Sequence, residues 1–440
     1  MFTKEPIYYY SIIRKRFPNS YLTEDERQII IGIDCDYVDS YEYDFKMLKN
    51  YYNLLIKKGK IAPFAGLFGT FSYETVHYFE KIKKIENSQF EFPKFIFANA
   101  KAYLHYSKVS KDYSFYGNKK YFDNLKKEAE KEKENKKNFE NKNKREKEIY
   151  YSVETDLSAE KNHFYEIVEK AKEYIKSGDI FQVVLSEQLK LKTNMDSLEF
   201  YRYLSKANPS PYMFHFPTKY GDVVGSSPEI LVEITSDNIY IAPIAGTRPR
   251  GKDANEDAFL ANDLLNDEKE CAEHRMLVDL ARNDVGKFAE KGSVVVKNLM
   301  HIKNYQHVMH IVSEVYGKKR KDVSVFDVIS LALPAGTLSG SPKIRAMQII
   351  SEFEIYKRNV YGGGIGFLRF NGDVQIAIVI RTAFFENKNC DINKIDEKRT
   401  VFIQAGAGIV FDSVKENEYK EICNKRASII GVFEKNSKKI

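Results

Sequence analysis

Hydrophobic positions follow a helical spacing and then a strand spacing in the region after residue 157. Between residues 158 and 175, apolar side chains recur every three or four positions, at Phe164, Ile167, Val168, Ala171 and Ile175. This spacing predicts an amphipathic helix, and Ser158 is placed to be its N-cap. Ser177-Gly178-Asp179 should end the helix, and the apolar run 180–185 that follows predicts a buried strand.

Strand and helix patterns continue to the C-terminus. Strands are predicted at 222–224, 230–234, 238–241, 364–370, 374–385 and 400–405. Helices are predicted at about 254–265, 267–283, 323–332, 342–354 and 415–433. Because the strands come in pairs rather than alternating strictly with helices, the pattern favours an α+β fold with antiparallel sheets.

The first part of the chain has a different character. Residues 1–116 read mainly as strands and turns, with β-branched residues concentrated in Arg27–Val38. From Lys119 to Glu148 the chain has 12 basic and 8 acidic residues in 30 positions, so this segment should be a charged linker or an exposed helix. We therefore divide the chain into an N-terminal region 1–116, a charged linker or insertion 117–157 and a C-terminal region 158–440.

Composition excludes several classes of protein. The chain has 440 residues, 43% of them hydrophobic, which is typical of a folded globular protein. Its net charge of +7 comes from 69 basic and 62 acidic residues that interleave, and base-reading motifs are absent, so no nucleic-acid partner is expected. Four scattered cysteines, Cys35, Cys271, Cys390 and Cys423, argue against a zinc site or a disulfide framework. Without an apolar signal core or an apolar run of membrane-spanning length, a cytoplasmic protein with no membrane partner is expected.

Two pairs of acidic residues are candidates for binding a metal. Glu270 and Glu273 are three apart in a predicted helix, and so are Glu418 and Glu421 near the C-terminus. Each pair projects from one helical face, and four carboxylates brought together would suit a hard cation such as Mg²⁺. Either pair could instead be a solvated acidic face, with Lys425 as an ordinary partner one turn beyond Glu421.

Three glycine-rich turns and two isolated side chains are further candidates. Turns at 243–248 and 404–408 follow predicted strands, and a third at 335–343 precedes a helix. Small residues let backbone N–H groups approach an anion, although each segment could be only a tight turn. Arg381 could grip a carboxylate or form a surface ion pair, and His310 could be a general acid–base or a core histidine.

A set of sequence words connects these candidates to a known family. The words are GDIFQVVLSEQ, NPSPYMFHF, SSPEIL, PIAGTRPRG, DEKECAEHRMLVDLARNDVG, HVMHIVSEVYG, AGTLSGSPKIRAMQII, YGGGIGF, IAIVIRTA, QAGAGIV and DSVKENEYKEICNKRA. In this order, over 158–435, they resemble the chorismate-utilising enzymes, most closely the branch of anthranilate synthase component I (large subunit). The resemblance implies two stacked, largely antiparallel β-sheets with helices packed outside. It also implies that residues 158–440 form the chorismate-binding catalytic region, with sheets shared with the N-terminal region.

That resemblance implies an activity and a site. The activity would be that of a lyase that aminates chorismate and eliminates pyruvate to give anthranilate, the first committed step of tryptophan biosynthesis. The implied cofactor is Mg²⁺, held by Glu270, Glu273, Glu418 and Glu421. The implied catalytic residues are His310, Thr337 and Glu229. The implied substrate-binding residues are Gln182, Gly246, Thr247, Tyr361, Arg381, Gly406, Ala407, Gly408 and Lys425.

Two positions favour ammonia as the nucleophile and anthranilate as the product. Gln182 stands where the water-adding relatives carry a lysine base, and a glutamine cannot deprotonate water. Ala245 stands where many aminodeoxychorismate synthases carry a lysine that attacks the ring. Aminodeoxychorismate synthase component I, of the folate pathway, is therefore the alternative. Because the sequence has no glutaminase nucleophile segment, the resemblance implies a glutamine amidotransferase subunit (component II) that supplies ammonia.

Regulation by L-tryptophan is a further expectation from the resemblance. One half of the feedback pocket is matched by Asn208, Pro209, Pro211, Tyr212 and Met213, whereas Asp25 falls where the other half usually has a serine. A reading from a different class is a non-catalytic, polyanion-binding protein that acts through the charged segment 119–148.

Overall fold

The chain folds around one ladder of antiparallel strands. The computed structural model describes residues 2–59, 61–139, 148–305, 308–387 and 398–439. The strands are β1 (Tyr21–Glu24), β2 (Gln28–Asp39), β3 (Gly66–Phe71), β4 (Phe95–Ser107), β5 (Asp112–Gly117), β6 (Tyr150–Val153), β7 (Gln182–Thr193), β8 (Tyr212–Pro217), β9 (Gly221–Ser227), β10 (Ile230–Thr235), β11 (Asn238–Ile241), β12 (Ile244–Pro249), β13 (Val295–Asn304), β14 (Val308–Lys318), β15 (Gly340–Ser341), β16 (Gly364–Arg369), β17 (Val374–Ile378), β18 (Thr382–Glu386), β19 (Arg399–Ile409) and β20 (Lys438–Lys439).

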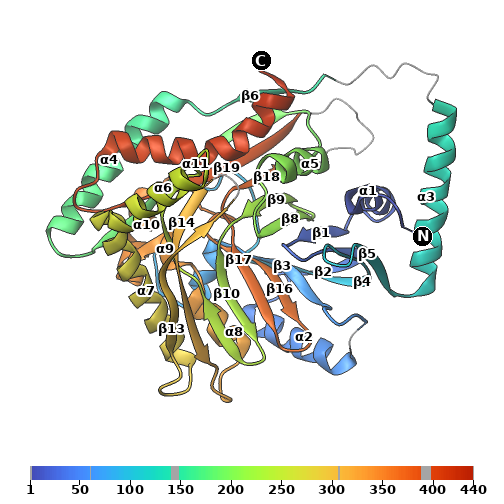
Figure 1. Cartoon of the computed structure of the whole chain (residues 1–440), viewed down its shortest axis with the longest axis horizontal. Helices are drawn as coiled ribbons and strands as arrows, with labels where there is room; N and C mark the ends of the chain where they lie inside the picture. The colour runs from blue at the N-terminus through green and yellow to red at the C-terminus, as the bar shows by residue number, and fades with distance from the viewer. Residues whose placement is uncertain (1, 60, 140–147, 306–307, 388–397, 440) are drawn as a thin grey trace.

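Helices surround this ladder (Figure 1). They are α1 (Pro6–Arg16), α2 (Phe45–Lys58), the 3₁₀ helix η1 (Tyr73–Tyr78), α3 (Lys119–Phe139), α4 (Leu157–Lys176), α5 (Ser197–Ala207), α6 (Ala254–Asn266), α7 (Glu268–Phe288), α8 (Val325–Ala332), α9 (Gly336–Ser339), α10 (Lys343–Phe353) and α11 (Lys415–Asn436). Three of them cover β7: Phe164 of α4, Met347 of α10 and Ile422 of α11 share a buried cluster with Val183 and Leu185.

Strand pairing is continuous from one end of the ladder to the other. The order is β6–β7–β19–β18–β9–β8–β1–β2–β4–β3–β16–β17–β10–β11–β14–β13, and each of these pairs is antiparallel. The strands of residues 1–116 therefore pair with later strands on both sides, β1 with β8 and β3 with β16.

The ladder folds back on itself to enclose an aromatic core. Phe68 of β3 lies 5.4 Å from Phe216 of β8 and 4.9 Å from Phe367 of β16, measured between ring centroids. Tyr21 of β1 stacks on Phe68 at 4.4 Å. Phe367 is the neighbour of Phe68 in the β3–β16 register, whereas β1 and β8 are not paired with β3. The contacts of Phe68 with Phe216 and Tyr21 therefore join two facing layers. The predicted α+β class with two largely antiparallel layers is confirmed, and hydrogen bonds through β2, β4 and β3 join the layers.

The predicted elements of 158–440 are present, with differences at their ends. Helix α4 begins earlier than expected, because Asp156 rather than Ser158 accepts hydrogen bonds from the first free N–H groups. The single strand predicted at 374–385 is two strands, β17 and β18, and the break contains Arg381 at φ +50°. The glycine-rich segments 243–248 and 404–408, predicted as turns, instead lie largely or wholly within β12 and β19.

The N-terminal region contains more helix than the sequence pattern showed, and part of the charged segment takes the helical alternative. Residues 1–116 include α1 and α2 in addition to strands. Within the charged segment, α3 is a helix on which Leu125 and Ala129 are buried. Residues 140–147 lie outside the described residues, so the linker reading stays a prediction there. The division at 116 and 157 also stays a prediction.

Two expectations from composition can be compared with the structure. Cys35, Cys271 and Cys423 are free thiols, and Cys390 lies outside the described residues. Of the helices that the structure describes, none combines the length and the apolar character that crossing a bilayer requires.

A buried cluster of charged groups ties α1 to the strands. Asp222 of β9 has a side chain only 4% exposed, and it accepts hydrogen bonds from Arg14 at 3.2 Å and from Arg399 at 3.0 Å. Ser197 donates to the same carboxylate at 2.5 Å and bonds His215 Nε2 at 3.0 Å. Burial alone would raise the pKa of Asp222, but Arg399 and Arg14 outweigh burial and hold that pKa well below its usual value.

This arrangement predicts a large loss of stability when the carboxylate is removed. In Asp222→Asn, Arg399 would lose its counter-charge, and Arg14 would keep only the exposed Asp196 as a partner. The free energy of unfolding should therefore fall by about 3–5 kcal/mol in urea denaturation. Since the folded-state pKa of Asp222 is depressed, its contribution is present above the unfolded pKa of about 3.9 and is lost as the pH falls below it.

The matched control is Asp322→Asn. The Asp322 side chain is 74% exposed and pairs with Arg320 at 3.2 Å, so its loss should lower the free energy of unfolding by less than about 1 kcal/mol. Equal losses in the two variants would contradict a special role for the buried cluster.

Candidate active site

The C-terminal end of β19 lies at the centre of the predicted site. Gly406, Ala407 and Gly408 pair there with Ser186, Leu185 and Val184 of β7. A Cβ on Gly406 would lie 2.9 Å from the Tyr361 hydroxyl, and a Cβ on Gly408 would lie 2.5 Å from Gln182 Nε2. A Cβ on Gly406 would also meet the backbone oxygen of Leu185 at 2.8 Å, so glycine is required there, whereas at Gly408 the Gln182 side chain would have to move.

Helix α7 brings the first acidic pair to this strand end. Gln182 Nε2 donates to Glu273 Oε1 at 2.8 Å, and a Cβ on Gly408 would lie 3.7 Å from the same oxygen. Gly246 of β12 has φ +65°, and a Cβ there would meet Glu270 Oε2 at 3.2 Å. Burial and the neighbouring charge of Glu273 raise the pKa of Glu270. Both acids thus lie between two glycine-containing strands.

Helix α11 brings the second acidic pair to the same end of β19. Lys425 Nζ donates to Gly406 O at 2.8 Å and pairs with Glu421 Oε1 at 2.7 Å. Burial and the charge of Glu421 raise the pKa of Glu418, whereas Lys269 at the start of α7 acts to lower it. The two pairs therefore lie on helices whose N-terminal turns interact electrostatically.

The predicted metal ligands do not form a closed site. Among the described residues, no group of three or more His, Cys, Asp or Glu side chains is close enough together to hold a metal ion. The donor chemistry nevertheless fits a hard cation, because Glu270 and Glu418 are largely shielded from water and each has an acidic neighbour that raises its pKa. Of the four acids, only Glu421 forms an ion pair within the part of the chain that the structure describes.

A second group of predicted residues surrounds the buried carboxyl of Glu229. Thr337 Oγ1 donates to Glu229 Oε1 at 3.0 Å. Burial raises the pKa of Glu229 to about 7, against the opposing effects of Thr337, Lys425 and Arg381. Burial also lowers the pKa of Arg381, while Glu229 raises it. Glu229 is therefore not a surface acid, since the residue is only 8% exposed.

The histidine of the predicted site is buried beside Gly246. His310 Nδ1 lies 2.8 Å from Gly246 O and 3.1 Å from Thr247 Oγ1. A carbonyl can only accept, so Nδ1 carries the proton and Nε2 is the basic nitrogen of the neutral ring. Burial lowers the pKa of His310, and the charge of Arg381 lowers it further. The histidine is buried and hydrogen-bonded, as a core histidine would be, and both of its partners, Gly246 and Thr247, are residues of the predicted site.

Two features of the site could not be recognised in the sequence. The ring of Tyr305 lies 5.5 Å from that of His310, and burial together with the charge of Glu229 raises its pKa to about 12. Arg358 is a fully buried cation that pairs with Glu354. A spacing of four residues between Glu354 and Arg358 is typical of exposed helix pairs, and Tyr305 stands in a polar stretch without periodicity, so neither carries a distinctive signal.

The segments predicted to bind tryptophan lie side by side. Strand β1 pairs with β8, and Glu24 is opposite Met213 in that register. Asn208 ends α5, and its carbonyl accepts a hydrogen bond from Ser226. Asp25 is engaged in its own turn, where it accepts hydrogen bonds from the backbone N–H groups of residues 27 and 28. A role for Asp25, Asn208, Pro209, Pro211, Tyr212 and Met213 in binding tryptophan remains a prediction.

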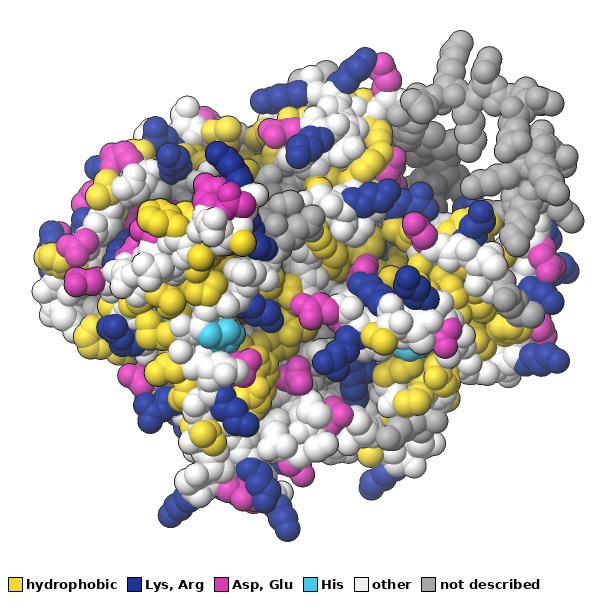
Figure 2. All heavy atoms as spheres, viewed as in Figure 1, with side chains coloured by type: hydrophobic (Ala, Val, Ile, Leu, Met, Phe, Trp, Pro, Cys, Tyr) yellow, Lys and Arg dark blue, Asp and Glu magenta, His cyan; other side chains and the backbone are white. Residues whose placement is uncertain are grey.

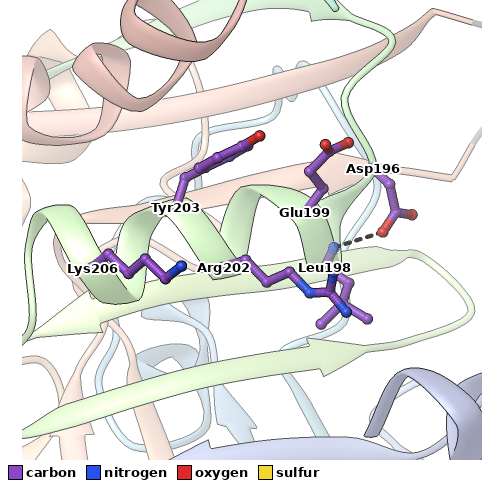
Figure 3. Close-up of a pocket in the computed structure, with 6 residues that line it drawn as sticks. All are labelled: Asp196, Leu198, Glu199, Arg202, Tyr203 and Lys206. Carbon is purple, nitrogen blue, oxygen red and sulfur yellow. Dashed lines mark hydrogen bonds between the residues drawn. The ribbon is translucent and has the colours of Figure 1, made fainter. Parts of the chain in front are cut away.

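Other surface features are less suited to the predicted chemistry. Figure 3 shows a hollow along α5 and its N-cap, lined by Asp196, Leu198, Glu199, Arg202, Tyr203 and Lys206, none of which is a predicted site residue. Basic and acidic side chains are interspersed over the face drawn in Figure 2. This distribution is typical of a solvated surface rather than of a polyanion-binding face.

Comparison with protein families gives a match over nearly the whole chain. The model of the family described as chorismate binding enzyme matches residues 14–431. Anthranilate synthase component 1 of Acetivibrio thermocellus is 48% identical over 294 residues, which is 66% of this chain and 56% of that protein. The corresponding protein of Aquifex aeolicus is 50% identical over 276 residues, which is 62% of this chain and 53% of that protein. The match thus spans a little over half the length of these relatives.

One solved structure matches a larger share of both chains than the sequence relatives do. Anthranilate synthase component I from Streptococcus pneumoniae has a TM-score of 0.71 and 30% sequence identity, covering 94% of this chain and 92% of that one. An isochorismate synthase from Bacillus anthracis, described as putative, has a TM-score of 0.67 at 18% identity over 97% of this chain and 99% of that one. At that identity the second likeness shows the fold alone.

The pKa of His310 tests the electrostatics of the site without an assay of activity. Arg381→Gln removes a positive charge that lowers this pKa, so the pKa should rise, while burial keeps it below the ordinary value of about 6.5. The measurement is a pH titration of ¹³C-labelled histidine by NMR, with the resonance assigned through His310→Gln. Arg282→Gln, which removes an exposed arginine that pairs with Asp279, should leave the titration unchanged. An unchanged or lower pKa in Arg381→Gln would refute the arrangement.

Proposed function

We propose a function for this chain, which belongs to the family of chorismate-binding enzymes: it is the large subunit of an anthranilate synthase. It would convert chorismate and ammonia to anthranilate and pyruvate. The observation that supports this most directly is the convergence of Glu229, Thr337, Arg381 and Lys425 near the glycine-containing end of β19. The relatives and the solved structure that carry the name anthranilate synthase component 1 support the same assignment.

The basic side chains would bind the carboxylates of the substrate. Arg381 offers a guanidinium that can form two parallel hydrogen bonds with one carboxylate, and Lys425 is held beside Gly406 O at 2.8 Å. Burial lowers the pKa of Arg381, and the charge of Glu229 only partly offsets this. A bound carboxylate would supply the missing negative charge, so binding of a dianionic substrate is favoured electrostatically.

Two groups could move protons in this site. Glu229 has a pKa of about 7 and can therefore be protonated at neutral pH, as a general acid for a departing hydroxyl requires. His310 is neutral, with Nδ1–H donated to Gly246 O and with Nε2 as the base. Thr337 holds one oxygen of Glu229 at 3.0 Å and thereby orients the carboxyl. We assign proton donation to Glu229 and proton transfer in the elimination to His310.

The identity of the product depends on whether a side-chain nucleophile stands at position 245, where many aminodeoxychorismate synthases carry a lysine that attacks the ring. Ala245 of β12 is buried and pairs with Ile311, and its methyl group has no nucleophile. Gln182 donates to Glu273 and cannot act as a base toward water. Both residues favour ammonia as the attacking group, and so favour anthranilate over an aminodeoxychorismate or isochorismate product.

The proposed cofactor is Mg²⁺. Its ligands would be Glu270, Glu273, Glu418 and Glu421, whose carboxylate oxygens are the donors this ion prefers. When bound, the ion would orient the ring carboxylate of the substrate and offset the mutual repulsion of the acids.

The proposed partner is a glutamine amidotransferase subunit that delivers ammonia. The relatives are named component 1, a name that presupposes a second component. We place the protein in the cytoplasm. We retain L-tryptophan as a candidate feedback inhibitor at the β1–β8 pair.

The first test is a product assay on the purified chain with chorismate, Mg²⁺ and excess ammonium. Fluorescent anthranilate with release of pyruvate, abolished by EDTA and restored by Mg²⁺, is the expected result. A non-fluorescent amino product without pyruvate would instead identify an aminodeoxychorismate synthase. Absence of chorismate turnover in the presence of Mg²⁺ would refute the catalytic assignment.

The role of Glu229 is tested by Glu229→Gln. Glutamine keeps the size of the side chain and its hydrogen bond with Thr337 but cannot donate a carboxylic proton, so kcat should fall by about 10²–10⁴-fold. Because the active form is protonated, kcat of the unmodified enzyme should fall as the pH rises through about 7, and this limb should be missing in the variant. The control is Glu233→Gln, which changes an acid four residues further along the chain, on β10. It should leave both kcat and its pH profile unaltered. If kcat of Glu229→Gln still falls as the pH rises through about 7, Glu229 is not the group whose titration causes that fall.

A further inference from the structure

A second cavity has a chemistry of its own. It has a volume of about 410 Å³, within the range typical of small-molecule sites. Its walls come from η1, from the loop that leads to β4 and from the turn 357–359. None of its lining residues belongs to the predicted chorismate, metal or tryptophan sets. It therefore needs an explanation separate from the proposed activity.

Three lysines line this cavity without a carboxylate partner. They are Lys84, Lys94 and Lys357, and within the part of the chain that the structure describes none of them forms an ion pair. Burial lowers the pKa of Lys94, and the charges of Lys84 and Lys357 contribute, against the opposing charge of Glu74. Burial, and to a smaller extent the same three ammonium groups, lowers the pKa of His77 to about 4. Lys84 and Lys357 are thus close enough to Lys94 to destabilise its charge.

The inner wall has one carboxyl, that of Glu74, and it offsets part of this charge. Glu74 Oε1 accepts the backbone N–H of Arg358 at 3.0 Å, whereas its Oε2 is buried and has no hydrogen-bond partner among the described residues. Burial raises the pKa of Glu74 to about 7. His77 likewise has a buried Nδ1 without a partner. The two other acids of the lining, Glu86 and Glu91, are exposed at its rim, and Glu91 accepts a hydrogen bond from Tyr41 at 3.2 Å.

Aromatic side chains supply the remaining wall. Lys94 Nζ lies 4.4 Å from the centre of the Tyr78 ring, and Phe90 and Phe92 are buried in the same lining. The cavity is much larger than a single inorganic ion requires. A ligand that fills it would present anionic oxygens to the lysines and an organic portion to the rings.

We propose that this cavity binds a small organic oxyanion, a phosphate ester or a polycarboxylate, through Lys84, Lys94 and Lys357. The unpaired ammonium groups supply the attraction, and charge-assisted hydrogen bonds to oxygen are the contacts they lack. The site is adjacent to the proposed active site in the chain, because the turn that carries Lys357 continues through Arg358 to Tyr361.

The test is a titration of the full chain with citrate and, separately, with inorganic phosphate, in chloride buffer of matched ionic strength. Isothermal calorimetry should detect binding of at least one probe. In Lys94→Gln/Lys357→Gln the dissociation constant should rise by about tenfold or more, since two charge-assisted contacts are removed. Lys81→Gln/Lys83→Gln, which removes two exposed lysines of the same loop that do not line the cavity, is the matched control and should bind as the unmodified chain does.

The two probes distinguish the two ligand classes. Tighter binding of citrate would assign the site to polycarboxylates, and tighter binding of phosphate would assign it to phosphate esters. Binding of neither probe, or equal affinities for the unmodified chain and the Lys94/Lys357 variant, would overturn the proposal. Unfolding in urea, measured for each variant, separates loss of binding from loss of the fold. The outcome does not depend on the product of the chorismate reaction.

Discussion

The site depends on a guanidinium that has no access to solvent. Arg358 and Glu354 form a buried ion pair whose side chains are 0% and 3% exposed. The remaining N–H groups of Arg358 donate to Leu338 O at 2.6 Å and to Val184 O at 2.7 Å. Glu354 also accepts from the backbone and the hydroxyl of Ser186 at 2.9 and 2.7 Å. A buried charge is tolerated only when it is paired and hydrogen-bonded, so β7, α9 and the end of α10 are held in one arrangement.

The consequence of this constraint is the placement of residues that are predicted to bind the substrate. Tyr361 lies beside Arg358, with its ring centre 5.7 Å from the guanidinium carbon, and its hydroxyl lies over Gly406. Val184, which accepts from Arg358, is opposite Gly408 in the β7–β19 register. Because one cation fixes both neighbours, the glycine-containing end of β19 and the tyrosine that covers it are positioned together. The chemistry of the site therefore rests on a structural ion pair that does not itself belong to the predicted set.

The predicted site has two halves that differ in the sign of the charge that predominates. Around Glu229, cations predominate: Arg381 and Lys425 lower a pKa that burial raises to about 7. Around α7 and α11, carboxyls predominate, and each helix carries two acids within one turn. A dianionic substrate would relieve the first imbalance and a divalent cation the second. In the cavity lined by Lys84, Lys94 and Lys357, cations without ion-pair partners are again gathered together. For this reason we assign an anionic ligand to that cavity as well.

The sequence by itself determined the fold class and most elements of 158–440, and it supplied the residues of the predicted site. Hydrophobic spacing located α4 and α11 to within a few residues, because a helix that buries one face must repeat at that spacing. It did not show that 404–408 continues a strand, since glycine is as frequent in turns, and only pairing with β7 decides between them. Nor could it distinguish Arg358 from a surface arginine. Burial and long-range pairing decide those questions, and both depend on residues that are distant in the chain and adjacent only once the ladder has folded back on itself.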